Sequence, residues 1–273
     1  MTEITLEEAK SIQLEVLKEF RAVCEREGLR YSLFAGTLIG AMRHKGYIPW
    51  DDDVDVAMPR EDYERFFKIF QETPHPEHLK LYDSRIVPGY HCPFIKVADA
   101  RTLQLTPGKE ILPVKFGLHI DVFPVDGVPR YRWVAKLYLK FMRFLRHCSE
   151  MSMLTLGVKG RAWQKRCLIF VFKILTLGAP PRLWHKLMNR IAVCFPLATS
   201  RWGGNVMWGY AEKEIAPVEC YRGDQSVSFE GDVFNAFSGA DTYLRCVYGD
   251  YMTPPPLDKR VANHLVASYR ISD

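Results

Sequence analysis

Four carboxylates crowd a short stretch of the chain: Asp51, Asp52, Asp53 and Asp55. Like charges at this spacing repel one another, and a divalent cation is the simplest compensation. The alternation around residues 53–57 predicts a strand, on which Asp53 and Asp55 share one face while the intervening valines point into the core. Asp52 would point away from that pair. Asp51 would orient the site or coordinate through water.

A second strand contributes a further carboxylate. Leu118, Ile120 and Val122 form its apolar face, which leaves three residues on the other face: His119, Asp121 and Phe123. An acid within an apolar strand is costly unless it is paired or bound to a metal. We therefore expect Asp53, Asp55 and Asp121 to bind one or two Mg²⁺ ions, for which Mn²⁺ could substitute. The alternative is a solvated acidic loop, with Asp121 as a charge at a strand edge.

A Gly-Thr turn at residues 36–40 precedes the acidic run. Free backbone N–H groups at the start of a helix bind phosphate, Gly36 and Gly40 permit close approach, and the Thr37 hydroxyl adds a donor. The alternative is a simple turn from strand to helix. Further cationic donors follow in the sequence: Arg43, His44 and Lys45. Lys96 lies in an otherwise apolar strand, where it either extends to solvent or contacts substrate.

These residues require a framework of helices and strands. A capping box at Thr5 and a glycine at position 28 predict a first helix. Strands are predicted at 31–35, 53–57, 79–83, 94–98 and 117–123, with helices at 36–44, around 63–70 and from residue 240. Neither an internal repeat nor a low-complexity segment is present.

Composition describes an ordinary folded protein. The chain has 273 residues, of which 48% are hydrophobic and 25% charged, and this excludes wholesale disorder. The acidic and polar start lacks the basic region of a secretory signal, so we expect the chain to stay in the cytosol. Seven scattered cysteines without C-x-x-C spacing argue against a disulfide framework or a zinc site, and we expect them to be buried thiols.

Charge is unevenly distributed along the chain. Residues 130–201 contain fifteen Lys or Arg and one acid, Glu150, so the rest of the chain is net acidic although the whole carries +5. This basic insert predicts amphipathic helices. On one of them Lys136, Lys140, Arg143 and His147 share a face, and five apolar residues line the other face: Leu137, Phe141, Phe144, Leu145 and Cys148.

The basic insert has two interpretations. One is a helical subdomain with a solvated basic face, and the other, which we favour, is docking on the anionic cytoplasmic leaflet of a membrane. No apolar run reaches the roughly 20 residues that a spanning helix needs. No RNA- or DNA-binding motif is recognisable, so we expect no nucleic-acid partner.

Residues 36–55, GTLIGAMRHKGYIPWDDDVD, closely resemble the signature of the LicD family, which is related to fukutin and fukutin-related protein. The run HIDVFPVD at 119–126 is similar to the second block of the family. Tyr243-Leu244, the run YGDYM at 248–252 and Pro254-Pro255 resemble its C-terminal block. The sequence is thereby identified as a member of this family, with a resemblance that spans residues 10–264 and is loose in the insert.

This resemblance implies an α+β, nucleotidyltransferase-like fold with a mixed β-sheet flanked by helices. The expected parts are a catalytic core at 1–129, the basic helical insert at 130–201, and a C-terminal segment at 202–273 that packs back on the core. The metal aspartates of the family carry over onto Asp53, Asp55 and Asp121, and the signature run adds Trp50 to the substrate-binding residues.

The implied reaction transfers a phospho-alcohol group from a cytidine diphosphate (CDP) donor to a glycan, including lipid-linked glycans, with release of CMP. In bacterial members the group is typically phosphocholine and the acceptor is a teichoic acid, capsule or lipopolysaccharide. We expect an enzyme at the inner face of the plasma membrane. The alternatives are transfer of ribitol or glycerol phosphate, a nucleotidyltransferase that uses NTP, and a non-catalytic binding protein, against which the intact acids argue.

Choline would require an aromatic cage around its quaternary ammonium. By composition alone, the candidates are Trp202, Trp208, Tyr210 and Tyr221. Each of these residues could equally pack in the core.

Overall fold

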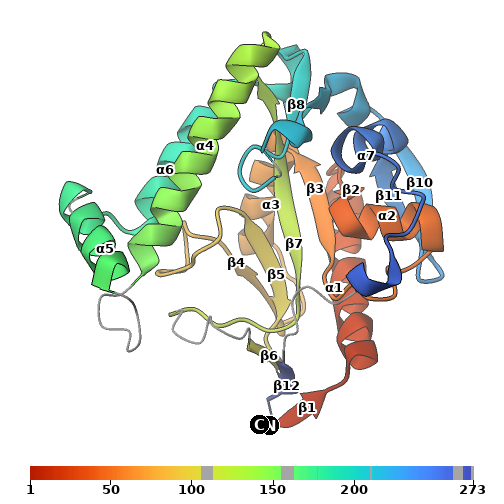
Figure 1. Cartoon of the computed structure of the whole chain (residues 1–273). Helices are drawn as coiled ribbons and strands as arrows, with labels where there is room; N and C mark the ends of the chain where they lie inside the picture. Colours follow the sequence, from red (N-terminus) through yellow and green to blue (C-terminus); the bar gives the residue numbers. More distant parts are fainter. Residues whose placement is uncertain (106–112, 155–162, 177, 210, 261–266, 272–273) are drawn as a thin grey trace.

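The computed structural model describes the chain except for residues 106–112, 155–162, 177, 210, 261–266 and 272–273. Its main sheet has seven strands, and the main path through it follows the order β2 (Ser32–Leu33), β3 (Asp55–Pro59), β7 (His119–Val128), β5 (Ile95–Asp99) and β4 (Leu79–Tyr82), as Figure 1 shows. The β3–β7 pairing is parallel, whereas the other pairings along this path are antiparallel. The predicted α+β class with a mixed sheet flanked by helices is confirmed.

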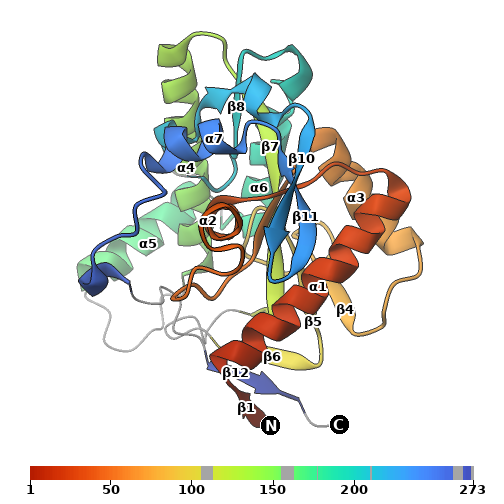
Figure 2. The ribbon, with the colours of Figure 1, turned by 90° about the vertical axis from the view of Figure 1, so that its right-hand side faces the viewer.

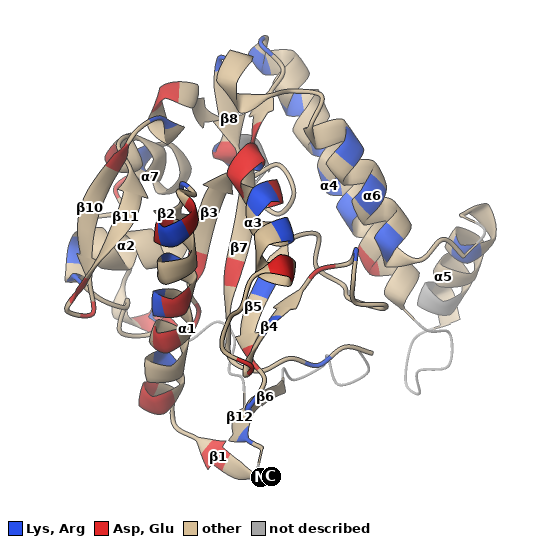
Figure 3. Cartoon of the chain, turned by 180° about the vertical axis from the view of Figure 1, so that it is seen from behind, with Lys and Arg blue, Asp and Glu red and all other residues tan. Residues whose placement is uncertain are grey.

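One face of the sheet is covered by α1 (Leu6–Glu27) and α3 (Arg60–Glu72), which lie in front of it in Figure 3. Thr5 and Glu8 form the predicted capping box, and Gly28 closes α1 in the left-handed conformation that favours glycine. The rings of Phe20 on α1 and Phe66 on α3 lie 5.0 Å apart in the core. The local signals in the sequence therefore place both helices correctly.

The edge of the main sheet formed by β2 is flanked by three further elements, as Figure 2 shows. They are α2 (Ala35–His44), α7 (Ala240–Tyr248) and the hairpin of β10 (Asp224–Phe229) and β11 (Asp232–Phe237). Near the chain ends, β1 (Thr2–Ile4), β12 (Ala267–Arg270) and β6 (Thr102–Leu105) form a small sheet. Two short strands, β8 (Trp202–Gly204) and β9 (Ala216–Pro217), extend the end of β7. Short 3₁₀ turns lie at Leu197–Thr199, Ala211–Glu214, Val218–Tyr221 and Leu257–Lys259.

The basic insert comprises α4 (Arg132–Met153), α5 (Trp163–Leu175) and α6 (Pro181–Ala192). It leaves the sheet after β7 and returns as β8, which pairs with the end of β7. Its core joins α4 to α6 and to residues 206–215. The boundaries predicted at 129, 130, 201 and 202 stay predictions. Among the described residues, no helix has the length and apolar character needed to cross a membrane.

The apolar face predicted on α4 is divided by the fold: Leu137, Phe141 and Phe144 are exposed, because α4 turns a different face to the core, whereas Leu145 and Cys148 are buried. One expectation about burial was wrong in part, because three of the seven cysteines are exposed rather than buried: Cys167, Cys194 and Cys246.

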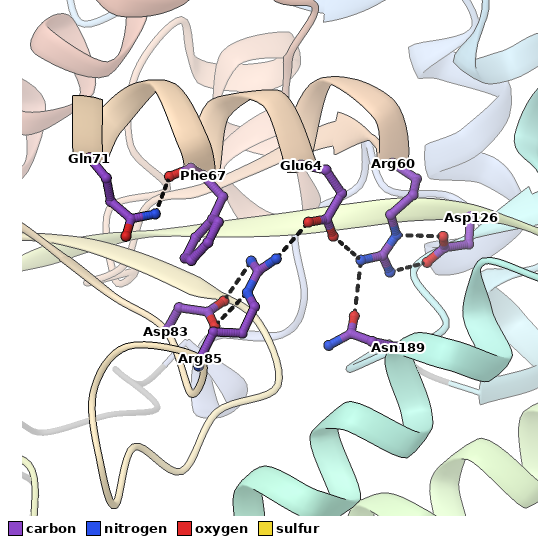
Figure 4. A network of polar contacts seen from close by, with 8 residues as sticks. All are labelled: Arg60, Glu64, Phe67, Gln71, Asp83, Arg85, Asp126 and Asn189. Atoms are coloured by element: carbon purple, nitrogen blue, oxygen red, sulfur yellow. Dashed lines mark hydrogen bonds and ion pairs between the residues drawn. The ribbon is translucent and has the colours of Figure 1, made fainter. Parts of the chain in front are cut away.

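A buried ion pair connects the sheet, α3 and the insert (Figure 4). Arg60 donates two hydrogen bonds to the Asp126 carboxylate, at 2.7 and 2.6 Å, and a third to Asn189 Oδ1 on α6 at 3.0 Å. Glu64 accepts from both Arg60 and Arg85, at 3.2 and 2.5 Å. Because a buried charge is stable only when its partners are present, this network fixes how α6 sits against the main sheet.

Candidate active site

Three charged residues lie side by side across the three central strands. Asp55 on β3 is the register partner of Asp121 on β7, and Asp121 is in turn the register partner of Lys96 on β5. Residues paired in register on neighbouring strands have side chains on the same face, about 5 Å apart. The sheet therefore brings together two carboxylates from separate parts of the sequence and places a lysine beside them.

Lys96 is held by two partners. Its ammonium contacts Asp121 Oδ1 and lies 2.8 Å from His119 Nε2, while His119 Nδ1 lies 2.9 Å from the Gly117 carbonyl oxygen. Burial, and then the Lys96 charge, lower the pKa of His119 to about 4, so this imidazole is neutral at pH 7. The contacts assign its proton to Nδ1, which leaves Nε2 to accept from Lys96.

The protonation of Lys96 is also favoured by its surroundings. Burial acts to lower its pKa, but the carboxylates of Asp121 and Asp55 outweigh burial and raise the pKa of Lys96 overall. The pocket thus contains a buried ammonium group that stays charged.

The remaining carboxylates repel one another. Burial and the charges of Asp53, Asp121 and Asp51 raise the pKa of Asp55 well above its usual range. Burial, Asp53 and Asp52 raise the pKa of Asp51 to about 7. These raised pKa values mean that the ionised carboxylates repel one another, and that a positive charge placed among them would be stabilised.

A pocket of about 380 Å³ opens over this row. It is lined by Asp52, Asp53, Asp55 and Asp121, together with Lys96 and His119. The expectation that Asp52 points away is wrong, because Asp52 lines the pocket. Asp51 is absent from the lining and lies instead against the turn, where a Cβ added to Gly36 would be 2.6 Å from Asp51 Oδ2.

The three residues of the Gly-Thr turn that were predicted to bind phosphate, Gly36, Thr37 and Gly40, make contacts within the fold. Thr37 is buried, and its hydroxyl accepts a hydrogen bond from the Asp55 backbone N–H at 2.8 Å. Gly40 allows the chain to approach closely, since a Cβ there would lie 2.4 Å from the Gly46 carbonyl oxygen. Ala35, which precedes the turn, lines the pocket, whereas Gly36, Thr37 and Gly40 do not. The turn therefore positions β3, and phosphate binding there stays a prediction.

The other predicted substrate-binding residues also lie outside the pocket lining. Arg43 donates to the Tyr251 carbonyl oxygen at 2.5 Å and to His44 Nε2 at 2.9 Å. The backbone of Lys45 accepts from Glu230, and the Trp50 ring lies under the Arg260 guanidinium. The structure thus separates these four residues from Lys96, which does line the pocket.

Aromatic side chains form much of the pocket wall: Phe34, Phe94, Phe116, Phe123 and Trp208. Of the predicted cage residues, Trp208 lines the pocket, with its ring centroid 5.3 Å from that of Phe94. Trp202 and Tyr221 lie elsewhere, and Tyr210 falls outside the described residues. Phe94 lies two residues before Lys96, so the alternation that placed Asp121 and Phe123 on one face could also have identified Phe94.

The carboxylates of this row are oxygen donors of the kind that a hard cation prefers. Among the described residues, no three His, Cys, Asp or Glu side chains form a group able to hold a metal ion. The register of Asp55 and Asp121 nevertheless supplies two oxygen donors on one face. Gln13, another lining residue, has a buried Oε1 with no hydrogen-bond partner in the described part of the chain. Mg²⁺ at this site stays a prediction.

Comparison with known proteins gives the class of this domain. Residues 28–141 match the family model described as LicD/FKTN/FKRP, nucleotidyltransferase domain. The chain is 33% identical over 276 residues to the lipopolysaccharide cholinephosphotransferase LicD of Haemophilus influenzae, and this match covers 98% of this chain and 99% of the relative. The protein therefore belongs to the LicD family.

Two partial similarities accompany this match. The ribitol 5-phosphate transferase FKRP of Homo sapiens is 52% identical over 40 residues, which is 15% of this chain and 8% of FKRP. An uncharacterized protein of Rickettsia typhi is 32% identical over 92 residues, or 32% of this chain and 29% of that protein.

Proposed function

We propose that this protein transfers phosphocholine from CDP-choline to a sugar of a cell-surface glycan, in a Mg²⁺-dependent reaction that releases CMP. The observation that carries the proposal is the row of Asp55, Asp121 and Lys96 at the base of an aromatic-walled pocket. The broader class, an enzyme that transfers substituted phosphate groups, follows from membership of the LicD family.

In the proposed reaction, an acceptor hydroxyl oxygen forms a bond to the phosphorus that bears choline, and the bond from that phosphorus to the CMP oxygen breaks. Asp53, Asp55 and Asp121 would hold the metal, which offsets the negative charge of the donor diphosphate and of the departing CMP. Asp121 accepts the hydroxyl proton. Lys96 offsets the charge of Asp121 and lines the pocket, where its ammonium would contact the donor diphosphate.

The aromatic wall supports choline as the transferred alcohol. A quaternary ammonium cannot donate hydrogen bonds, and it is recognised by the faces of aromatic rings. The rings of Phe94 and Phe116 already lie 5.2 Å from the Lys96 ammonium, so this wall accommodates a cation. Trp208 is 38% exposed and can contact a ligand from the rim.

The test is CMP release from a panel of CDP-alcohols with Mg²⁺ and a glycan acceptor. We expect CDP-choline to give the fastest release, and chelation of Mg²⁺ to stop it. Asp121→Asn should abolish turnover, and it should also lower the thermal unfolding midpoint because it leaves the buried Lys96 ammonium without its carboxylate partner, so turnover is measured well below that midpoint. Asp258→Asn, at an exposed carboxylate outside the pocket lining, is the matched control and should be fully active. Full activity of Asp121→Asn would refute the role of this row.

Two alternatives have support and give different products. The similarity to FKRP favours another CDP-alcohol, and faster CMP release from CDP-ribitol than from CDP-choline would establish it. The nucleotidyltransferase description of the matched domain favours transfer of a nucleotide from NTP, for which pyrophosphate rather than CMP would be the product.

A further inference from the structure

The outer face of α4 carries an apolar stripe that the fold does not use. Trp133, Leu137, Phe141 and Phe144 are 67%, 58%, 47% and 58% exposed. Their spacing of four, four and three residues places them on one side of the helix. Solvent-exposed aromatic and leucine side chains in a continuous stripe mark a surface that binds a partner.

The core of the insert is complete without this stripe. The opposite face of α4 buries Ala135, Leu139 and Met142 against Met188 and Ala192 of α6. Exposure of the stripe is therefore not a sign of a poorly packed helix, because α4 already has a full set of core contacts on its other side.

A second helix of the insert has the same character. Of the α5 side chains that the structure describes, Ile169 is the one that is buried. Leu168, Val171 and Leu175 are 61%, 49% and 78% exposed. Phe172 holds α5 against α6, with its ring centroid 6.3 Å from that of Trp184. Most of the described apolar side chains of α5 are therefore exposed to solvent rather than packed against the rest of the protein.

Positive charge accompanies these apolar faces. Lys136, Lys140 and Arg143 are exposed on α4 next to the stripe, and Figure 3 shows that Lys and Arg recur along α4 and α6. Residues 130–201 contain fifteen Lys or Arg but one acid. Docking of two copies of the chain through this surface would oppose like charges, so an anionic partner with an apolar interior fits better.

We propose that α4 and α5 dock the protein on the surface of an anionic phospholipid bilayer. The apolar side chains of the stripe and of α5 enter the boundary between headgroups and acyl chains, and the neighbouring Lys and Arg contact lipid phosphates. This mode of binding is interfacial and needs no spanning helix.

The docking surface adjoins the candidate active site. Arg146 on α4 donates to the Trp208 carbonyl oxygen at 2.7 Å, and its guanidinium lies 5.0 Å from the centroid of the Trp208 ring. Trp208 lines the pocket. One helix thus contacts the bilayer with one face and the pocket wall with another, which places the pocket close to acceptors carried by lipids.

Vesicle cosedimentation with the full chain at physiological salt tests the proposal. Vesicles of phosphatidylcholine containing about one third phosphatidylglycerol should bind the wild type at least ten-fold more tightly than vesicles of phosphatidylcholine alone. Equal binding to both vesicles, or binding to neither, would overturn the proposal. Because the assay contains no donor or acceptor, its outcome is independent of the proposed reaction.

Matched double variants separate the two contributions. Phe141→Ser with Phe144→Ser should weaken vesicle binding about 100-fold, at roughly ten-fold for each ring. Val233→Ser with Leu257→Ser, at exposed apolar side chains away from the insert, should change binding less than two-fold. If the stripe variant binds as tightly as the wild type, or if sedimentation shows that it splits a stable dimer, the stripe is not a lipid-binding surface.

The basic component has its own pair of variants. Lys140→Gln with Arg143→Gln, at exposed cations next to the stripe on α4, should weaken binding about 25-fold, at roughly five-fold for each charge. The control is Lys68→Gln with Lys80→Gln, at two exposed lysines that lie outside the basic insert.

A further test is quenching of tryptophan fluorescence by brominated lipids, which can be measured with a conservative substitution at an exposed side chain. Trp133→Phe should remove a quenched component, and unaltered quenching would contradict insertion of the stripe.

Discussion

Replacement of Asp55 by Asn tests the central physical claim, that buried carboxylates on adjacent strands require a cation. Asp55 and Asp121 are register partners on β3 and β7, so a cation between them would lie within about 4 Å of each charge. At an effective dielectric constant near 20, one unit charge at that distance contributes about 4 kcal/mol. Loss of one carboxylate charge should therefore lower kcat/KM by about 10³-fold.

The same substitution should not destabilise the protein. Burial, followed by the neighbouring carboxylates, raises the pKa of Asp55, which means that its ionised form is disfavoured in the fold. A neutral amide removes that cost, so the unfolding midpoint without metal should stay the same or rise. Mg²⁺ at 100 times its dissociation constant should stabilise the wild type by about 2.7 kcal/mol, or roughly 5–10 °C, and should stabilise the variant far less.

Two measurements on one preparation check this reasoning: CMP release, and thermal unfolding with and without Mg²⁺. Asp258→Asn again serves as the control, because that carboxylate is exposed and lies outside the pocket lining. Turnover of Asp55→Asn within ten-fold of the wild type, together with an unchanged Mg²⁺ shift, would refute the assignment.

Three further outcomes are expected. Lys96→Gln should lower kcat/KM at least about 100-fold, because it removes a preorganised charge from the pocket, and steady-state CMP release measures it. Asp126→Ala leaves the buried Arg60 without its bidentate partner and should cost about 3–5 kcal/mol, or roughly 6–20 °C in the unfolding midpoint, whereas a shift below about 2 °C would contradict the network. Burial lowers the pKa of His185 to about 4, so the unfolded chain binds more protons between about pH 6.5 and 4. His185 should therefore contribute a loss of about 3 kcal/mol in stability as pH drops through that window, and His185→Gln should remove this contribution from a denaturant-derived stability profile while that of His119 remains.

The sequence by itself determined the features that depend on local geometry. Side chains alternate along any strand, so the carboxylates of Asp55 and Asp121 could be assigned to the faces opposite the apolar side chains before their strands were known to be neighbours. The capping box at Thr5 and the left-handed Gly28 likewise fixed the ends of α1 from short-range interactions alone.

Two predictions from the sequence differ from the structure for physical reasons: the direction of Asp52 and the contacts of the turn at residues 36–40. Asp52 and Asp53 precede β3, where strict alternation no longer applies, and both line the pocket. The glycines of residues 36–40 could be read as a phosphate-binding turn because sequence cannot distinguish close approach to a ligand from close approach to the chain's own backbone. At Gly40 the neighbour is the Gly46 carbonyl oxygen.

Only the tertiary structure decided how distant segments meet. The contact of Lys96 with Asp121 depends on the register of β5 against β7, and the pairing of β1 with β12 joins the two ends of the chain. The apolar residues of α4 posed the same problem, since a hydrophobic stripe has the same sequence pattern whether it faces a core or a membrane. Which face is buried depends on the partner packed against it, and here α6 covers the other side, so Phe141 and Phe144 remain exposed.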